Sequence, residues 1–287
     1  MSRIFIISLV LLLSSCQPDS ARDSFILMNT IIEVNLDGIN EVEWYKIEQD
    51  FIKQTEEFDW HAKGGKGAEW DTLSRIAYTF RVQTQGCFDT RIRPLVKLWA
   101  DAKKSETLPS DDAIKEALKQ HEEDFGGIAK GYLADKLFDR LIKDGAVRGY
   151  INIGGHIRVI GNNLKTGKNW EIGIRHPDDK DKVFTNVSID QSRGVATSGD
   201  YERFFVYKGK KYCHILDPNT GYPPTHNVRS VTVIAPNLTI ADALATGLFV
   251  AGTEGAKEWF NKLPYKLDVY WILQGKDKLE LLHWNKD

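Results

Sequence analysis

The sequence predicts an α+β protein that folds as one compact unit. The first half of the 287-residue chain carries mostly helical spacings, whereas residues 150–235 change to short strands separated by turns. Helices and strands do not alternate as regular βαβ units, and neither a short-period repeat nor a low-complexity linker divides the chain. A chain of this length buries a sizeable core without disulfide or metal staples.

Each expected element depends on a local pattern of apolar, capping or turn residues. Helices are expected at 40–58, 73–82, 94–102, 111–119, 132–143, 239–251 and near 254–262. Strands are expected at 24–36, 149–153, 170–174, 194–197, 204–207, 230–235 and 268–273, the last of which closes the chain. Ser110 is an expected N-cap, and residues 59–69, which contain three glycines, are expected to form a mobile loop.

The N-terminus has the pattern of an export signal. Arg3 gives a basic start, residues 4–13 are almost wholly apolar, and Leu13-Ser14-Ser15-Cys16 has the form of a lipobox, which predicts lipidation of Cys16. The apolar run of about ten residues is too short to span a bilayer as a mature helix. An ordinary secretory signal with a chance cysteine is the alternative.

These signals divide the chain into three parts. We expect a lipoprotein signal peptide at 1–15, a lipidated tether at 16–23 and the folded domain at 24–287. The mature protein would be exported and anchored by lipid to a bacterial membrane, facing the periplasm.

Composition excludes several classes of function. The net charge is −2 and becomes −3 when Arg3 leaves with the signal, and no basic block favours nucleic acid. The mean hydropathy is −0.36, and no second apolar run reaches the length of a membrane span. Cys87 and Cys213 could pair in an oxidising compartment, but they lie in separate motifs and we expect no disulfide. No Cys/His cluster has zinc spacing.

A candidate metal pair lies near the end of the chain. Asp242 and Thr246 are four residues apart in an expected helix, so they share one face. A carboxylate and a hydroxyl are hard oxygen donors that suit Mg²⁺, and Mg²⁺ suits phosphate chemistry. The structural alternative is an amphipathic core helix in which the dipole favours an N-terminal Asp.

A candidate base precedes this helix. His214 stands beside the turn Asp217-Pro218-Asn219-Thr220-Gly221, and an imidazole accepts a proton near neutral pH. A lone histidine is more often structural. Asp217 is expected to cap the turn, and His226 is a weaker candidate base.

A glycine-rich loop covers Asp124-Phe125-Gly126-Gly127-Ile128-Ala129-Lys130-Gly131. Its glycines let backbone approach a ligand, the helix that follows directs N–H groups at an anion, and Lys130 supplies positive charge. The spacing is not that of a Walker loop, so a helix cap with a solvated lysine is the alternative.

In combination, these motifs resemble the ApbE family of flavin transferases, which move FMN from FAD onto a protein threonine. The resemblance spans roughly residues 25–262 and implies a T-fold-like unit of two similar α+β halves with the active site between them. It implies that the Gly127 carbonyl, Asp242 and Thr246 hold Mg²⁺ and that His214 is the general base.

The resemblance also implies an FAD-binding set: Met28, Cys87, Phe88, Asp89, Asp124, Lys130 and Cys213. Gly154-Gly155 would shape the site, and Ser198-Gly199-Asp200-Tyr201 with Arg203 would form its wall, with Asp200 free to pair with Arg203.

The chain departs from the family at two places. Met28-Asn29-Thr30 stands where relatives have Met-Gly-Thr, and the family pattern is degraded over 58–77, where Trp60 is a candidate replacement for a site aromatic. His176 is expected to be a surface residue.

The implied reaction is Mg²⁺-dependent transfer of FMN from FAD to a threonine hydroxyl of an acceptor protein, with release of AMP. A membrane electron-transfer subunit is the acceptor that the family suggests. Two alternatives stay open: a Mg²⁺-dependent FAD pyrophosphatase that gives FMN and AMP, and a non-catalytic FAD-binding lipoprotein.

Overall fold

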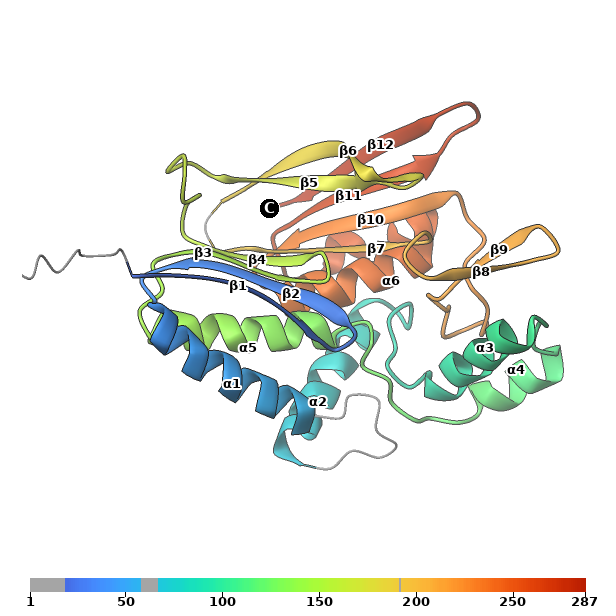
Figure 1. Cartoon of the computed structure of the whole chain (residues 1–287). Helices are drawn as coiled ribbons and strands as arrows, with labels where there is room; N and C mark the ends of the chain where they lie inside the picture. The colour runs from blue at the N-terminus through green and yellow to red at the C-terminus, as the bar shows by residue number, and fades with distance from the viewer. Residues whose placement is uncertain (1–18, 58–66, 191) are drawn as a thin grey trace, which may run out of the picture.

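The computed structural model describes residues 19–57, 67–190 and 192–287 (Figure 1). The expected signal peptide, Cys16 and Trp60 therefore lie outside the described residues. None of the helices in the described part of the chain combines the length and apolarity needed to cross a bilayer.

One antiparallel sheet of eight strands forms the centre of the molecule, in the order β1-β2-β3-β4-β7-β10-β11-β12 (Figure 1). Its strands are β1 (Ser20–Leu27), β2 (Thr30–Asp37), β3 (Arg148–Ile153), β4 (His156–Ile160), β7 (Gly194–Gly199), β10 (Val228–Ala235), β11 (Leu267–Gln274) and β12 (Leu279–Lys286).

The sheet is built from two halves of the same plan. In the first half, the pair β1–β2 is followed by α5 (Ala129–Lys143) and then the pair β3–β4; in the second, β7–β10 is followed by α6 (Leu238–Ala256) and then β11–β12. The halves meet where β4 pairs with β7 at only two positions, Ile157↔Val195 and Arg158↔Gly194. The expected α+β unit of two similar halves is confirmed.

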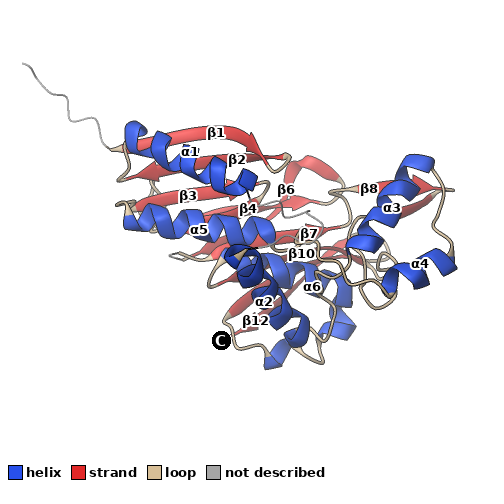
Figure 2. Cartoon of the chain, turned by 90° about the horizontal axis from the view of Figure 1, so that it is seen from below, coloured by secondary structure: helices blue, strands red, loops and turns tan. Residues whose placement is uncertain are grey.

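Helices cover one face of the sheet, and a hairpin covers the other (Figures 1 and 2). The helical layer contains α1 (Glu41–Glu57), α2 (Ala68–Gln83), α5 and α6, and the hairpin is β5 (Trp170–His176) with β6 (Asp179–Ile189). The central strand β10 is therefore buried on both faces: Val231 and Val233 join the helical core, whereas Ile234 joins the core under the hairpin. This explains its almost continuous apolar sequence.

A small lobe projects beside the main sheet (Figure 1). It contains α3 (Arg93–Ser105), α4 (Asp111–Leu118) and the hairpin β8 (Phe204–Tyr207) with β9 (Lys210–Cys213). Trp99 lies in its core and donates from Nε1 to the Gly221 carbonyl at 2.8 Å, which ties the lobe to the turn after His214. Ser110 caps α4 by accepting from the Ala113 amide at 3.2 Å, as the sequence predicts.

Several boundaries differ from expectation. The strand expected at 24–36 is a hairpin, because Met28 and Asn29 both have φ of 55° and turn the chain between Leu27 and Thr30. β1 begins at Ser20, so residues 20–23 lie in a strand, although they were expected to belong to the tether.

The C-terminal end was also predicted incompletely. β12 follows the strand that was expected to close the chain. The helix expected near 254–262 is wrong: α6 continues to Ala256 through a kink at Gly252, and only the short 3₁₀ turn η1 (Phe260–Lys262) follows.

Candidate active site

The N-terminal ends of α5 and α6 touch at Gly131. The Gly131 amide donates to Asp242 Oδ2 at 3.0 Å, and Asp242 is 2% exposed. A Cβ at position 131 would lie 2.4 Å from the Leu238 carbonyl oxygen, so only glycine permits this approach. The contact brings the loop at 124–131 from the first half onto the predicted metal helix of the second.

This contact also changes the hydrogen bonding of the loop. In a regular helical turn, the Gly131 amide would donate to the carbonyl four residues earlier, that of Gly127. It donates to Asp242 instead, and among the described residues no hydrogen bond to the Gly127 carbonyl is formed. A Cβ at Gly127 would lie 3.2 Å from Thr246 Oγ1, and Ser198 Oγ lies 3.3 Å from that same oxygen.

The donor set fits a magnesium ion. A carboxylate, a hydroxyl and a backbone carbonyl are hard oxygen ligands, and Mg²⁺ sites commonly use one or two carboxylates together with waters and substrate phosphates. Among the described residues, no group of three or more His, Cys, Asp and Glu side chains gathers as a metal site, so the set here has one carboxylate and depends on a hydroxyl and a carbonyl for its other ligands. Asp242, Thr246 and Gly127 are the residues that would hold the ion.

A histidine that the sequence analysis missed connects this carboxylate to Lys130. His156, the first residue of β4, is 5% exposed. Lys130 Nζ donates to His156 Nε2 at 2.6 Å, and His156 Nδ1 lies 3.3 Å from Asp242 Oδ1. Burial, reinforced by the charge of Lys130, lowers the pKa of His156 to about 4. Burial also lowers the pKa of Lys130, although Asp242 opposes that shift.

The turn before His156 sets its position. Gly154 and Gly155 both have positive φ, 58° and 89°, and close a two-residue hairpin that pairs Ile153 with His156. The paired glycines, which the resemblance gives a shaping role, form a tight turn in the structure. The turn lies beside the Met28 hairpin, since a Cβ on Gly154 would meet Thr30 Oγ1.

His214 has the hydrogen bonding expected of a general base. The Arg203 carbonyl accepts from the His214 backbone amide at 2.9 Å and lies 3.0 Å from Nδ1. Because a carbonyl only accepts, Nδ1 carries the proton of the neutral ring and Nε2 has a free lone pair.

The environment of His214 keeps it neutral. The residue is exposed at the surface, yet desolvation by the surrounding protein lowers the pKa of its ring to about 4. The cations Arg203 and Lys130 act in the same direction. Asp217 holds the following turn, since it accepts from the Asn219 amide at 2.8 Å and from Thr220 Oγ1 at 3.1 Å, as predicted.

The turn at 86–89 packs against the same site. Phe88 is 2% exposed, and its ring lies 3.3 Å from where a Gly127 Cβ would be. Burial alone would raise the pKa of the Asp89 carboxyl. Hydrogen bonds from Arg91 and Arg81 outweigh burial and hold that pKa below its usual range. In the glycine-rich loop at 124–131, Asp124 Oδ1 accepts from the Gly126 amide at 2.9 Å.

Both described cysteines are free thiols, as expected. Burial raises the pKa of Cys87 and of Cys213 to about 11, so neither is a reactive thiolate at neutral pH. Cys213 Sγ donates to the Ile215 carbonyl at 3.5 Å.

Other polar residues singled out in the sequence have structural partners. Asp200 does not form the alternative pair with Arg203; it pairs with Arg229 at 3.1 Å and with Lys211 at 3.2 Å. His226 Nε2 lies 2.6 Å from the Phe249 carbonyl oxygen beside the kink of α6, a contact that stabilises the kink. His176 packs against Phe184 on the covering hairpin.

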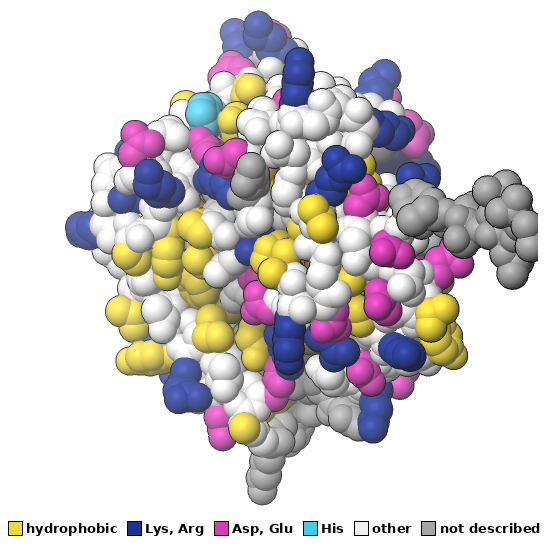
Figure 3. All heavy atoms as spheres, turned by 90° about the vertical axis from the view of Figure 1, so that its left-hand side faces the viewer, with side chains coloured by type: hydrophobic (Ala, Val, Ile, Leu, Met, Phe, Trp, Pro, Cys, Tyr) yellow, Lys and Arg dark blue, Asp and Glu magenta, His cyan; other side chains and the backbone are white. Residues whose placement is uncertain are grey.

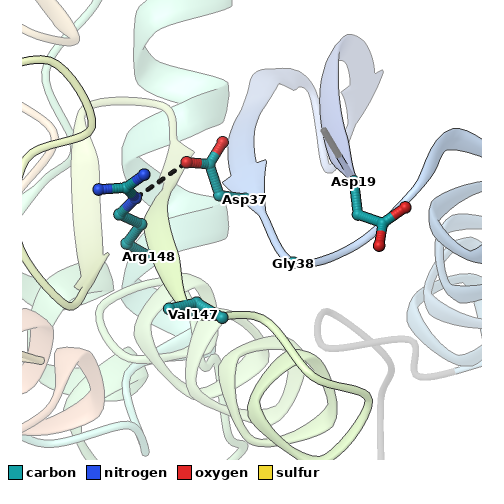
Figure 4. A pocket seen from close by; sticks show the side chains of 5 residues that line it. All are labelled: Asp19, Asp37, Gly38, Val147 and Arg148. Atoms are coloured by element: carbon teal, nitrogen blue, oxygen red, sulfur yellow. Dashed lines mark hydrogen bonds and ion pairs between the residues drawn. The ribbon is translucent and has the colours of Figure 1, made fainter. Parts of the chain in front are cut away.

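A hollow lies at the other end of α5, away from Lys130. It has a volume of about 350 Å³ and is lined by Asp19, Asp37, Gly38, Val147 and Arg148 (Figure 4). Asp37 and Arg148 pair at 2.9 Å in its wall. The face at this end of the molecule carries interspersed acidic and basic side chains and no block of one sign (Figure 3).

The fold and the site together define an α+β protein in which two similar halves bring polar and charged side chains together at the α5–α6 contact. The chain belongs to the ApbE family, whose sequence model matches residues 59–271.

Named relatives share about a third of their residues with this chain. FAD:protein FMN transferase of Haemophilus influenzae is 34% identical over 217 residues, covering 67% of this chain and 62% of that protein. The Treponema pallidum protein of the same name is 33% identical over 239 residues, covering 71% and 65%. The chain therefore matches less than two thirds of the length of these relatives.

Solved structures share the fold over nearly the whole chain. The ApbE protein of Thermotoga maritima superimposes with a TM-score of 0.76 at 30% identity, covering 91% of this chain and 96% of that one. The flavinyl transferase ApbE of Pseudomonas stutzeri gives a TM-score of 0.76 at 23% identity, covering 92% and 95%.

Proposed function

We propose that this protein is a Mg²⁺-dependent FAD:protein FMN transferase that moves FMN from FAD to a threonine hydroxyl of an acceptor protein and releases AMP. The observation that carries the proposal is the cluster at the α5–α6 contact. There the Gly131 amide donates to Asp242, Thr246 lies against Gly127, and His156 joins Asp242 to the ammonium of Lys130. Names of relatives at 33–34% identity support the same reaction.

The first step is binding of the FAD diphosphate. Lys130 stands in the first turn of α5, where the ammonium and the positive end of the helix dipole both favour an anion. When bound, Mg²⁺ would neutralise charge on the diphosphate. The glycines of the loop let its backbone approach the ligand, because no side chain intervenes.

The second step is attack by the acceptor. The threonine oxygen bonds to the FMN-side phosphorus, the bond from that phosphorus to the bridging oxygen breaks, and AMP leaves with that oxygen. Nε2 of His214 accepts the hydroxyl proton, because Nδ1 is already committed to the Arg203 carbonyl. Positioning and charge stabilisation supply most of the rate in such an in-line displacement.

The exposure of His214 makes hydrolysis the second candidate. Water reaches an exposed base as readily as a threonine hydroxyl does, and FAD would then yield free FMN and AMP. An acceptor that covers the base would suppress this reaction.

The cellular setting is part of the proposal. We infer from the lipobox that Cys16 carries lipid and anchors the enzyme to a bacterial membrane so that it faces the periplasm, where a membrane electron-transfer subunit would be its acceptor. Labelling cells with a radioactive fatty acid should mark the wild-type chain and leave Cys16→Ser unmarked.

The reaction itself is tested by weighing the acceptor. The full chain is incubated with FAD, Mg²⁺ and a threonine-bearing acceptor domain, and the acceptor is analysed by mass spectrometry. A mass gain equal to one FMN less one water, which disappears with Asp242→Ala, supports transfer. An unmodified acceptor with released FMN and AMP would identify a hydrolase, and intact FAD would identify a carrier.

A further inference from the structure

His156 links the two charged groups of the site. Its imidazole lies between the ammonium of Lys130, 2.6 Å from Nε2, and the carboxylate of Asp242, 3.3 Å from Nδ1. These groups come from α5, β4 and α6 and therefore from both halves of the fold.

The protonation of the ring follows from its neighbours. An ammonium only donates hydrogen bonds, so Nε2 must be the acceptor and Nδ1 must carry the proton of the neutral ring. That proton faces the side of Asp242, but Nδ1 makes no hydrogen bond of good geometry among the described residues. A buried donor without a partner costs free energy, which an apolar residue at this position would avoid.

The strand holds the ring in place. The Gly154-Gly155 turn fixes His156 as the first residue of β4, and the ring is almost wholly buried. Because the ring is rigid and neutral, it fixes where Lys130 and Asp242 lie relative to each other. Groups that orient a metal ligand commonly affect metal affinity by tenfold or more.

We propose that His156 is a positioning residue that joins Lys130 to Asp242, so that the diphosphate-binding cation and the metal-binding carboxylate are held in one geometry. Nε2 orients the lysine through a hydrogen bond, and Nδ1–H, 3.3 Å from Oδ1, orients the carboxylate by electrostatic attraction. This inference depends on the proposed function, because it takes FAD and Mg²⁺ as the ligands.

Two substitutions separate the two ring nitrogens. In His156→Asn, the amide N–H can replace Nδ1–H, but nothing reaches Lys130. In His156→Gln, the longer side chain brings a carbonyl oxygen near the place of Nε2, but the donor to Asp242 is lost. His226→Gln is the matched control, because that histidine contacts the Phe249 carbonyl and lies outside the site.

Binding is measured without turnover. Mg²⁺ affinity is taken from the rise in melting temperature with MgCl₂, and FAD affinity from the change in flavin fluorescence. His156→Gln should lower the affinity for Mg²⁺ by about tenfold and leave that for FAD within about threefold, whereas His156→Asn should do the reverse. His226→Gln should lower the melting temperature and leave both affinities unchanged.

The outcomes distinguish this inference from the proposed function. If both His156 variants lose stability but keep both affinities, or lose both affinities equally, the positioning role is overturned. If the affinities separate as described but no FMN reaches any acceptor, the positioning role stands and the transferase proposal fails. A wild-type protein that binds neither Mg²⁺ nor FAD would overturn both.

Discussion

The contact between α5 and α6 at Gly131 makes a prediction that the structure allows to be worked in detail. In Gly131→Ala, the new Cβ would lie 2.4 Å from the Leu238 carbonyl oxygen, 2.8 Å from its carbonyl carbon and 2.9 Å from Asp242 Cβ. Two of these atoms are backbone and cannot rotate away. The helices would have to separate by roughly 1 Å to restore ordinary contact distances.

The expected loss in the free energy of unfolding of Gly131→Ala is the balance of two opposing effects. Overpacking of this kind costs up to about 3 kcal/mol, and replacing a helical glycine by alanine returns about 1 kcal/mol. The net loss of about 2 kcal/mol should lower the melting temperature by about 4–8 °C for a chain of this size. Because the separation also weakens the hydrogen bond from the Gly131 amide to Asp242, the stabilisation by Mg²⁺ should fall.

Gly127→Ala is the matched control in the same loop. Its Cβ would lie 3.2 Å from Thr246 Oγ1 and 3.3 Å from Phe88 Cε2, both of which belong to side chains. Small side-chain shifts relieve such contacts, so the melting temperature should stay within about 3 °C of wild type. Differential scanning calorimetry with and without MgCl₂ measures both variants, and equal melting temperatures for the two would refute the reasoning.

Three further predictions concern stability and catalysis. The pKa of His156 is about 4 in the folded protein and ordinarily 6.5, so the unfolded chain takes up the proton first and stability is lost as pH falls from 6.5 towards 4. Urea unfolding should show a loss of stability between pH 7 and pH 5 that is about 2 kcal/mol smaller in His156→Gln than in wild type, because His214, whose pKa is also about 4, keeps its own share. An unchanged pH slope in the variant would contradict this prediction. Asp135 caps the start of α6, because it accepts from the amides of Leu238 and Thr239 at 3.0 and 2.8 Å. Asp135→Ala should therefore lower the free energy of unfolding in urea by about 1–2 kcal/mol and weaken the stabilisation by Mg²⁺. A variant as stable as wild type would be inconsistent with this capping role. His214→Gln should lower the transfer rate by about 10²–10⁴-fold with FAD affinity unchanged, as measured by acceptor mass over time, and a wild-type rate would exclude His214 as the base.

Local patterns in the sequence predict the part of the site that local geometry determines. Asp242 and Thr246 share a helical face because four residues make about one turn, and Asp217 caps its own turn with groups two and three residues away. His156 could not be predicted in this way, because sheet register and the packing of two helices bring it to Lys130 and Asp242.

The same distinction between local patterns and tertiary contacts explains where the predicted fold differs from the structure. The hairpin at Met28-Asn29 lacks the usual Asn-Gly signal, so the sequence predicts one continuous strand over residues 24–36. The long strand β6 carries mostly polar and exposed residues, and only its last four residues, 186–189, alternate between exposed and buried. Its place depends on pairing with β5, which is a tertiary contact.

The most direct test of transfer is the ratio of AMP released to acceptor modified in a single reaction. The full chain, FAD, Mg²⁺ and a threonine-bearing acceptor are mixed, AMP is quantified by chromatography, and flavinylated acceptor is quantified by mass spectrometry. The account predicts one AMP for each modified acceptor, with little AMP formed when the threonine is replaced by valine. AMP that forms at the same rate without the threonine, together with an equal amount of free FMN, would contradict it.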